Sequence, residues 1–295
     1  MTRPKGPWGP ERAFLGYSVP YEDARYVILP VPYDSTASCR PGARFGPRQI
    51  IDSSALLETF DPYTGRDLSE LPIHTLPETS VPRADHDKAL RLVEDLTRSI
   101  VSDGKVPIIL GGDHSVTIGA FLGAQSTGRL AFISLDAHLD SYGEFEGSPL
   151  GHASVTARCS ERAVASMVVG ARAAGREEVR VARERGVEII WAWELKENLS
   201  KLAAALENLQ GMRAYISFDV DVLDPSLVPC TGCPEPGGLD WYEAVRALEL
   251  IMRAVRPVAL DFVELGDCRA RPDAPYLVAK LVAHALGALD SLSNV

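Results

Sequence analysis

Short, almost wholly apolar runs alternate with segments of helical periodicity along most of this 295-residue chain. The runs are rich in Val and Ile, as is typical of strands that are buried on both faces of a sheet. The candidate strands are residues 26–31, 106–110, 130–135, 167–169, 187–191, 214–218 and 257–262, with a weaker one near 73–76. The alternation predicts an α/β fold, a three-layer sandwich in which helices cover both faces of a central, mostly parallel sheet of eight strands.

Helical periodicity occupies the segments between the candidate strands. Apolar residues repeat at helical spacing in residues 89–100, 195–209 and 275–289. Asp240 followed by Glu243 has the spacing of a capping box and predicts the start of another helix. No linker or internal repeat interrupts the pattern, so we expect one domain over residues 1–295, with residues 1–24 as an irregular N-terminal arm.

Composition excludes several classes of protein. The 40 acidic residues outnumber the 30 basic ones and give a formal net charge of −10, which argues against a protein that binds nucleic acid or an anionic membrane through bulk charge. No apolar run approaches the ~20 residues that cross a bilayer. Residues 1–10 lack the apolar core of a signal peptide, so we expect a cytoplasmic protein.

Acidic and histidine side chains follow three of the candidate strands. They lie in Gly-Gly-Asp-His-Ser at 111–115, Asp-Ala-His-Leu-Asp at 136–140 and Asp-Val-Asp at 219–221. The candidate ligands are His114, Asp136, His138, Asp140, Asp219 and Asp221. In parallel sheets, the carboxyl ends of the strands form the ligand-binding edge, and Asp and His are costly there unless they are paired or bound to metal.

Oxygen ligands mixed with imidazole, without a thiolate, suit Mn²⁺ or a similar divalent ion. Six ligands with four carboxylates are too many for one ion with open positions, whereas bridging carboxylates would hold two ions ~3.5–4 Å apart with a shared water. Taken singly, an Asp-x-Asp is often a turn or a helix cap, and a histidine at a strand end is often structural. Three such motifs at successive strand ends favour a metal site.

The three motifs resemble those of the ureohydrolase family, which comprises the arginases, the agmatinases and their relatives. The family pattern Gly-Gly-Asp-His, Asp-Ala-His-x-Asp and Ser-Phe-Asp-x-Asp-x-Leu-Asp-Pro stands here at 111–114, 136–140 and 217–225. Residues 40–47 and 234–239 are similar to the agmatinase branch. The resemblance covers about residues 26–290 and implies an arginase-like fold and a homo-oligomer, a trimer or a hexamer.

The resemblance also implies a role for each site residue. One Mn²⁺ would be held by His114, Asp136, Asp140 and Asp219, and a second Mn²⁺ by Asp136, His138, Asp219 and Asp221. The two ions would lower the pKa of a bridging water, and the resulting hydroxide would attack the guanidinium carbon of the substrate. Asp140 could orient that hydroxide.

Two further residues complete the implied site. Glu264 would pair with the guanidinium group, because a carboxylate matches its planar fork, and His152 would bind substrate and shuttle a proton to the leaving amine. The alternatives are a surface or capping role for Glu264 and a loop-anchoring role for His152.

The reaction implied is the hydrolysis of a small cationic guanidino substrate, namely agmatine to putrescine and urea or an agmatine-like amine, a step of polyamine biosynthesis. An arginase or a guanidino-acid amidinohydrolase is the alternative. It would need a group for the substrate carboxylate, and Arg172 and residues 175–177 are the candidates. A non-catalytic metal-binding scaffold or assembly subunit is an alternative from another class.

Cysteines mark the places where the chain departs from the family pattern. Cys230 and Cys233 stand where the family usually has Gly and Thr, and Cys39 stands where a Tyr is common. Residues 265–269 also differ from the usual agmatinase turn. The Cys-x-x-Cys pair could be a disulfide, two buried free thiols or a redox switch, and no second half-site for zinc is visible.

Overall fold

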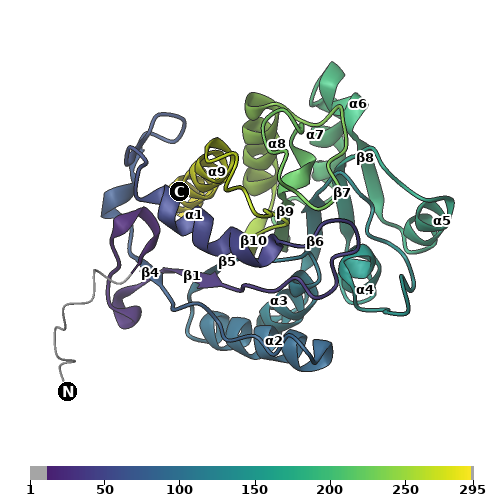
Figure 1. The fold of residues 1–295 in the computed structure, drawn as a ribbon. Coiled ribbons are helices and arrows are strands. Elements are labelled where there is room, and N and C mark those ends of the chain that lie inside the picture. Colours follow the sequence, from purple (N-terminus) through teal and green to yellow (C-terminus); the bar gives the residue numbers. More distant parts are fainter. Residues whose placement is uncertain (1–11, 294–295) are drawn as a thin grey trace.

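The computed structural model describes residues 12–293 (Figure 1) and contains an eight-stranded sheet in the order β4-β1-β5-β10-β9-β6-β7-β8. All pairings within this sheet are parallel. Its strands are β1 (Tyr26–Pro30), β4 (Ile73–Thr75), β5 (Val106–Leu110), β6 (Ala131–Leu135), β7 (Ser166–Ala171), β8 (Glu188–Trp191), β9 (Arg213–Asp219) and β10 (Arg256–Val263). The eight predicted strands, including the weak one, are therefore confirmed.

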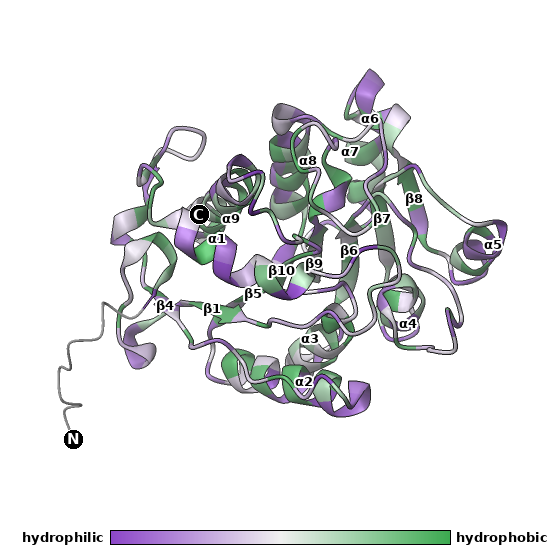
Figure 2. Cartoon of the chain, viewed as in Figure 1, coloured by the Kyte–Doolittle hydropathy of each residue, from purple (hydrophilic) through white to green (hydrophobic). Residues whose placement is uncertain are grey.

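Helices cover both faces of the sheet. They are α1 (Gly46–Ser54), α2 (His86–Ser102), α3 (Val116–Ala124), α4 (Val155–Ser160), α5 (Arg176–Glu184), α6 (Ala192–Glu197), α7 (Ser200–Glu207), α8 (Trp241–Ala254) and α9 (Asp273–Ser293). Within β1, Tyr26 and Ile28 belong to the core shared with α1, α6, α7, α8 and α9, whereas Val27 and Leu29 face α2, α3 and α4. Alternate side chains of one strand thus enter two cores, and Figure 2 shows the apolar strands between the helical layers.

The prediction of one continuous helix over residues 195–209 is wrong. The chain forms α6 and α7 instead, because Asn198 adopts an extended conformation and its side-chain oxygen accepts a hydrogen bond from the backbone N–H of Ser200 at 2.9 Å. The capping box is confirmed, since Asp240 and Glu243 each accept a hydrogen bond from the other's backbone N–H at 2.9 and 2.8 Å.

Two features lie outside the sheet. Residues 1–11 of the expected arm are outside the described residues, and residues 12–24 form only short 3₁₀ turns at Phe14–Gly16 and Tyr21–Asp23. A hairpin of β2 (Phe60–Asp61) and β3 (Arg66–Asp67), which the sequence analysis did not predict, packs on α9.

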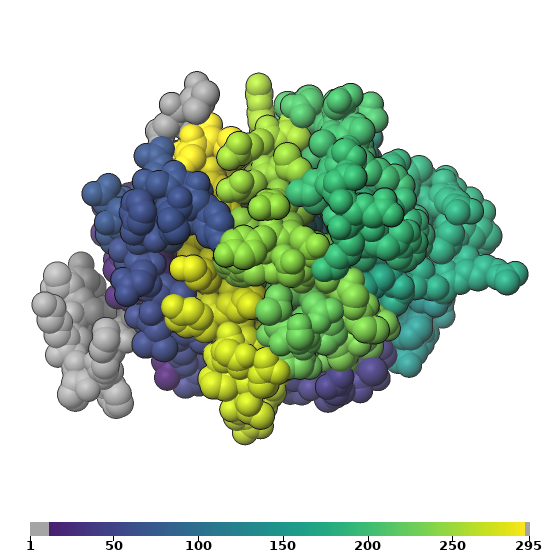
Figure 3. Space-filling view, turned by 90° about the horizontal axis from the view of Figure 1, so that it is seen from above, coloured from purple at the N-terminus to yellow at the C-terminus, as the bar shows by residue number. Residues whose placement is uncertain are grey.

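Segments that are far apart in the sequence share one surface. In Figure 3 the C-terminal segment, in yellow, lies between residues of the N-terminal third, in blue, and the green residues of the α8 region. Helix α9 packs on both α1 and α8. Within residues 12–293, no helix combines the length and the apolar character that crossing a bilayer requires.

Candidate metal centre

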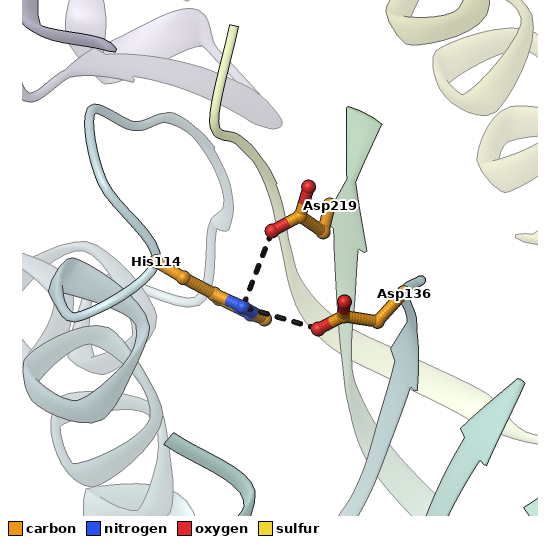
Figure 4. Close-up of side chains that lie close together, drawn as sticks. All are labelled: His114, Asp136 and Asp219. Atoms are coloured by element: carbon orange, nitrogen blue, oxygen red, sulfur yellow. Dashed lines mark ion pairs between the residues drawn. The ribbon is translucent and has the colours of Figure 1, made fainter. Parts of the chain in front are cut away.

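Four neighbouring strands, β5, β10, β9 and β6, bring the candidate residues to one edge of the sheet. His114 follows β5, Glu264 follows β10, Asp219 ends β9 and Asp136 follows β6. Residues up to 150 positions apart in sequence are therefore side by side, because the chain inserts its last strands between β5 and β6. Figure 4 shows how three of them converge.

The first group of ligands surrounds the imidazole of His114. Its Nδ1 lies 2.8 Å from an oxygen of Asp140, 3.2 Å from Asp136 Oδ2 and 3.4 Å from Asp219 Oδ2. All four residues are buried. One ligand atom from each of His114, Asp136 and Asp219 falls within 4.8 Å of the others, which is close enough for a single ion.

The second group contains Asp136, His138 and Asp221. His138 Nδ1 lies 2.9 Å from Asp221 Oδ2 and 3.8 Å from Asp136 Oδ1. The two oxygens of Asp136 therefore face different histidines, as a carboxylate that bridges two ions would. Asp136 is the residue that the two groups share.

Backbone hydrogen bonds orient these carboxylates. Asp219 Oδ1 accepts from the N–H of Asp221 at 2.9 Å, and Asp221 Oδ1 accepts from the N–H of Ala137 at 3.0 Å. In each case one oxygen is held by the backbone and the other is left to point into the site. The Asp-x-Asp motif is thus a local cap, as the structural interpretation expected, and it leaves one oxygen of each carboxylate available to a metal ion.

The electrostatics of the site favour bound cations. Burial, followed by the charges of Asp140 and Asp221, raises the pKa of Asp136 to about 7. Burial and the same crowding by Asp221 raise the pKa of Asp219 well above its ordinary value. Asp136 Oδ2 is buried and accepts no hydrogen bond. Such a group is costly unless a positive charge compensates it, so the donor set fits two divalent ions.

A chain of buried hydrogen bonds fixes the other side of His114. Its Nε2 lies 3.0 Å from Ser217 Oγ, and that hydroxyl donates to Asp261 Oδ1 at 2.6 Å. Asp261 Oδ2 accepts from Tyr215 at 2.5 Å and Thr117 at 2.7 Å. This hydrogen-bonded support for His114 was not predicted from the sequence, although the polar residues within two apolar strand runs could have indicated it. Such partners set the orientation of a metal-binding histidine.

Arg172 does not have the role considered for it. Its guanidinium donates to the carbonyl oxygens of Asp221 at 2.7 Å and Glu235 at 2.9 Å. The side chain is therefore occupied in holding the loop that carries Asp221, and Arg172 is not among the described residues that line the cavity below. The expectation that it could receive a substrate carboxylate is wrong.

A cavity of about 260 Å³ opens beside the two ligand groups and is lined by Asp140, His152 and Glu264. Glu264 Oε1 accepts a hydrogen bond from the backbone N–H of His114 at 2.6 Å. His152 Nε2 lies 3.1 Å from Ser38 Oγ, and its backbone N–H donates to Thr36 Oγ1 at 3.1 Å. The structure thus brings both residues to the cavity that contains metal-ligand candidates.

Two of the cavity residues have left-handed backbone conformations. Asp140 has φ 44° and Glu264 has φ 65°. Such conformations cost of order 1–3 kcal/mol for residues other than glycine and cluster at functional sites. The backbone of Glu264 is held by a hydrogen bond from its N–H to the carbonyl of Gly112 at 2.8 Å, so the strain is sustained by the loop that also carries His114.

Among the charged side chains that line the cavity, the acidic ones predominate. Beyond Asp140 and Glu264, Glu178 reaches it from α5, and Arg40 contributes a basic side chain at the rim. The wall nearest α5 consists of Ala173, Ala174 and Gly175. A cavity of this charge attracts a small cation.

The cysteines pair differently from every possibility considered. Cys230 is bonded to Cys268, whereas Cys233 is a free thiol, as are Cys39 and Cys159. The predicted alternatives for the Cys-x-x-Cys pair are therefore wrong, because the loops after β9 and β10 lie next to each other and bring Cys268 to Cys230. Spacing along the chain could not show this contact. Cys39 and Cys233 both line the cavity.

Comparisons with known proteins agree with this geometry. The model of the Arginase family matches residues 24–287. The N(1)-aminopropylagmatine ureohydrolase of Thermus thermophilus is 39% identical over 269 residues, which cover 91% of each chain. The agmatinase of Pyrococcus horikoshii is 34% identical over 272 residues, covering 92% of this chain and 94% of the relative. The agmatine ureohydrolase of Thermoplasma volcanium has a similar structure, with a TM-score of 0.82 at 29% identity, covering 94% of this chain and 93% of the other.

Proposed function

The chain belongs to the arginase family, and we propose that it is a dimanganese ureohydrolase that releases urea from agmatine or from its aminopropyl derivative. It is a hydrolase acting on an amidine C–N bond, as its relatives are. The observation that carries the metal assignment is Asp136, whose two oxygens face His114 and His138.

We assign one Mn²⁺ to His114, Asp136, Asp140 and Asp219, and the other to Asp136, His138, Asp219 and Asp221. Imidazole and carboxylate donors without a thiolate support Mn²⁺ as the metal. When bound, two such ions act as Lewis acids and make water a competent nucleophile at neutral pH.

The side chains of the protein supply the remaining functions. Glu264, at the cavity wall, would pair with the guanidinium group of the substrate and set its orientation. Asp140 would accept a hydrogen bond from the attacking water. His152, whose Nε2 contacts Ser38, would donate a proton to the leaving amine.

The cavity supports an amine tail on the substrate and argues against an amino acid tail. Arg172 is occupied by backbone carbonyls, and the wall of Ala173, Ala174 and Gly175 offers no cationic side chain. Among the described residues that line the cavity, Arg40 is the one arginine or lysine, and it is exposed. On the same side, Glu178 accepts hydrogen bonds from the backbone N–H groups of Gly175 and Ser141, and its charge, rather than a direct hydrogen bond, would favour a second positive charge on the substrate. We therefore expect agmatine and aminopropylagmatine to be better substrates than arginine or guanidinobutyrate.

A substrate panel tests the proposal. Urea release is measured with Mn²⁺-loaded protein on agmatine, N1-aminopropylagmatine, arginine and guanidinobutyrate. Activity on one of the first two supports the proposal, and activity on arginine or guanidinobutyrate alone would reverse the choice of substrate. Absence of urea from all four, together with about two bound Mn²⁺ per chain, would favour the metal-binding scaffold.

Oligomer formation is a further expectation for this family. Leu56 and Phe60, which lie beside and within the β2–β3 hairpin, are 75% and 57% exposed, and Tyr242 on α8 is 60% exposed. These exposed apolar side chains are candidates for burial between subunits, where a contiguous apolar patch would mark an interface. Sedimentation analysis should show a trimer or a hexamer, and a monomer would contradict the expectation.

A further inference from the structure

Two free cysteines lie at the mouth of the cavity on different loops. Cys39 is in the loop after β1 and is exposed, and Cys233 is in the loop before α8 and is partly buried. Both line the cavity that also contains His152 and Glu264. Cys39 is one of the causes that raise the pKa of the Cys233 thiol, as expected for two thiols that lie near each other in one cavity.

The two loops pack closely around this pair. A Cβ added to Gly232 would lie 3.8 Å from the carbonyl oxygen of Arg40 and 3.4 Å from Oε2 of Glu264. The loop of Cys233 is also attached to the loop that follows β10. Cys230 is bonded to Cys268, and the N–H of Gly266 donates to the Cys230 carbonyl at 2.7 Å. The segment that carries Cys233 is therefore fixed close to the segment that carries Cys39.

We propose that Cys39 and Cys233 form a dithiol modification site, which a peroxide closes into a disulfide across the mouth of the cavity. In the first step the sulfur of Cys39 attacks one oxygen of hydrogen peroxide, the O–O bond breaks, and a sulfenic acid and one water form. In the second step the sulfur of Cys233 attacks the sulfenic sulfur, and its proton leaves with the hydroxyl as a second water. Two thiols lose two electrons, and one peroxide is reduced to two waters.

The surroundings of the two thiols indicate which of them reacts with the peroxide first. Cys39 is exposed and meets the oxidant first. Burial, followed by its interaction with Cys39, raises the pKa of Cys233 to about 12. Because the thiolate is the nucleophile, Cys233 is the less reactive of the two thiols toward the oxidant, which leaves it to react with the sulfenic acid on Cys39. The thiol of Cys159 is buried in the core between the sheet and α4 and does not line the cavity.

The cross-link would affect the site through Ser38. Ser38 precedes Cys39, and its hydroxyl lies 3.1 Å from Nε2 of His152. Fixing Cys39 to Cys233 would constrain the segment that positions His152 and would narrow the entrance. The formation of the bond does not depend on the proposed function, whereas its effect on turnover rests on it.

The chemical test counts thiols. Purified protein is treated with hydrogen peroxide, desalted, denatured without reductant and titrated with a thiol reagent. The three free thiols should fall to one, with a peptide map that joins Cys39 to Cys233. Cys39→Ser and Cys233→Ser should each fail to form an intramolecular bond, whereas Cys159→Ala, the matched control, should form the Cys39–Cys233 bond. Three persisting thiols, or a new bond between Cys233 and Cys230 or Cys268, would overturn the proposal.

The functional test compares urea release from agmatine before and after oxidation, each variant against its own reduced form. Oxidised wild type and Cys159→Ala should lose about tenfold or more in turnover, because small displacements of site residues are costly, and a reductant should restore it. Cross-linked protein with unchanged turnover would overturn the proposed effect of the disulfide on the site. If no reduced form acts on agmatine or on N1-aminopropylagmatine, the proposed function fails, and the thiol count still decides the cross-link.

Discussion

The two carboxylate oxygens of Asp136 face different histidines. One of these oxygens, Oδ2, accepts no hydrogen bond. Asp136→Asn replaces that free oxygen or its partner with an amide NH₂, which cannot bind a cation. We expect bound Mn²⁺ to fall from about two per chain to one or fewer, and urea release to fall by at least about 10²-fold because the metals supply the nucleophile. Metal analysis and the urea assay measure the two effects.

Asp87→Asn in the first turn of α2 is the matched control, because it makes the same substitution away from the site. It should retain the metal content and the activity of the wild type. An Asp136→Asn protein that keeps two Mn²⁺ would show that Asp136 is not the shared ligand.

Ser217 contacts the proposed ligand His114 without itself being a proposed ligand. Ser217→Ala removes the contact with His114 Nε2 and leaves Asp261 Oδ1 without its donor. Loss of such a partner weakens metal binding by about 10–100-fold. The concentration of Mn²⁺ needed for half-maximal activity should rise accordingly, while turnover at saturating Mn²⁺ changes much less. A fall in saturated turnover with unchanged Mn²⁺ affinity would contradict a positioning role.

At the scale of elements, the Cys230–Cys268 bond joins the loops that follow β9 and β10. Replacing both cysteines with Ser should lower the free energy of unfolding by about 2–4 kcal/mol, because the bond restricts the unfolded chain. Urea denaturation without reductant measures the change. Adding a reductant should destabilise the wild type and leave the double variant unaffected, and an equal response of both would exclude this bond as the cause.

The β2–β3 hairpin is attached to α9 by a buried pair. Asp61 Oδ2 lies 2.9 Å from Nδ1 of His284 and accepts from Thr64 Oγ1 at 2.8 Å. Burial raises the pKa of Asp61, but these hydrogen bonds outweigh it and hold the pKa below 3.8. The ionised carboxylate therefore stabilises the fold above that pH, and the contribution is lost as the pH falls through the lower, folded-state pKa.

Asp61→Asn tests this attachment. At pH 7 the variant should unfold with a free energy about 1–3 kcal/mol below that of the wild type, and the difference should shrink when both are measured below pH 3.8. Asp67→Asn, which removes an exposed carboxylate from the same hairpin, should cost less at pH 7. A difference between Asp61→Asn and wild type that does not change with pH would mean that the charge of Asp61 is not what holds the hairpin.

Features that are set by residues close together in the sequence could be predicted, whereas features that are set by contacts between distant segments could not. The strands could be predicted, and so could the gathering of the candidate ligands that follow them, because burial on both faces and Asp-x-His spacing leave local patterns. The break at Asn198 could not be predicted from the apolar stripe, since a single side-chain cap ends α6. Two other features depend on contacts between loops that are distant in sequence, and hydrophobic periodicity does not reveal such contacts. They are the bond from Cys230 to Cys268 and the hydrogen bonds that Arg172 donates to backbone carbonyls.

For the whole molecule, topology decides where charge is concentrated. The net charge of −10 is spread over 295 residues, yet Asp136, Asp219 and Glu264 follow or end adjacent strands near the centre of the sheet. This placement concentrates negative potential in one cleft, and such a cleft attracts a cationic substrate and metal ions more strongly than bulk charge would.

Metal removal should therefore destabilise the whole fold. The candidate ligands come from the ends of β5, β6 and β9, so bound ions would link three strands that are separated in sequence by helices and further strands. Ions that bind only the folded state stabilise it by about 2.7 kcal/mol per site at a hundred times the dissociation constant. For a chain of this size we expect the unfolding midpoint to fall by several degrees in a chelator, at roughly 2–4 °C per kcal/mol.

Thermal melts in a chelator and over a Mn²⁺ titration measure this shift. The whole transition should move as one, because the ions bind at the centre of the sheet and not on a peripheral loop. Asp136→Asn should respond less than the wild type to Mn²⁺, and Asp87→Asn should respond fully. A midpoint that is the same with and without Mn²⁺ would mean that the carboxylates are stable without a compensating cation, contrary to the crowding that raises the pKa of Asp136 to about 7.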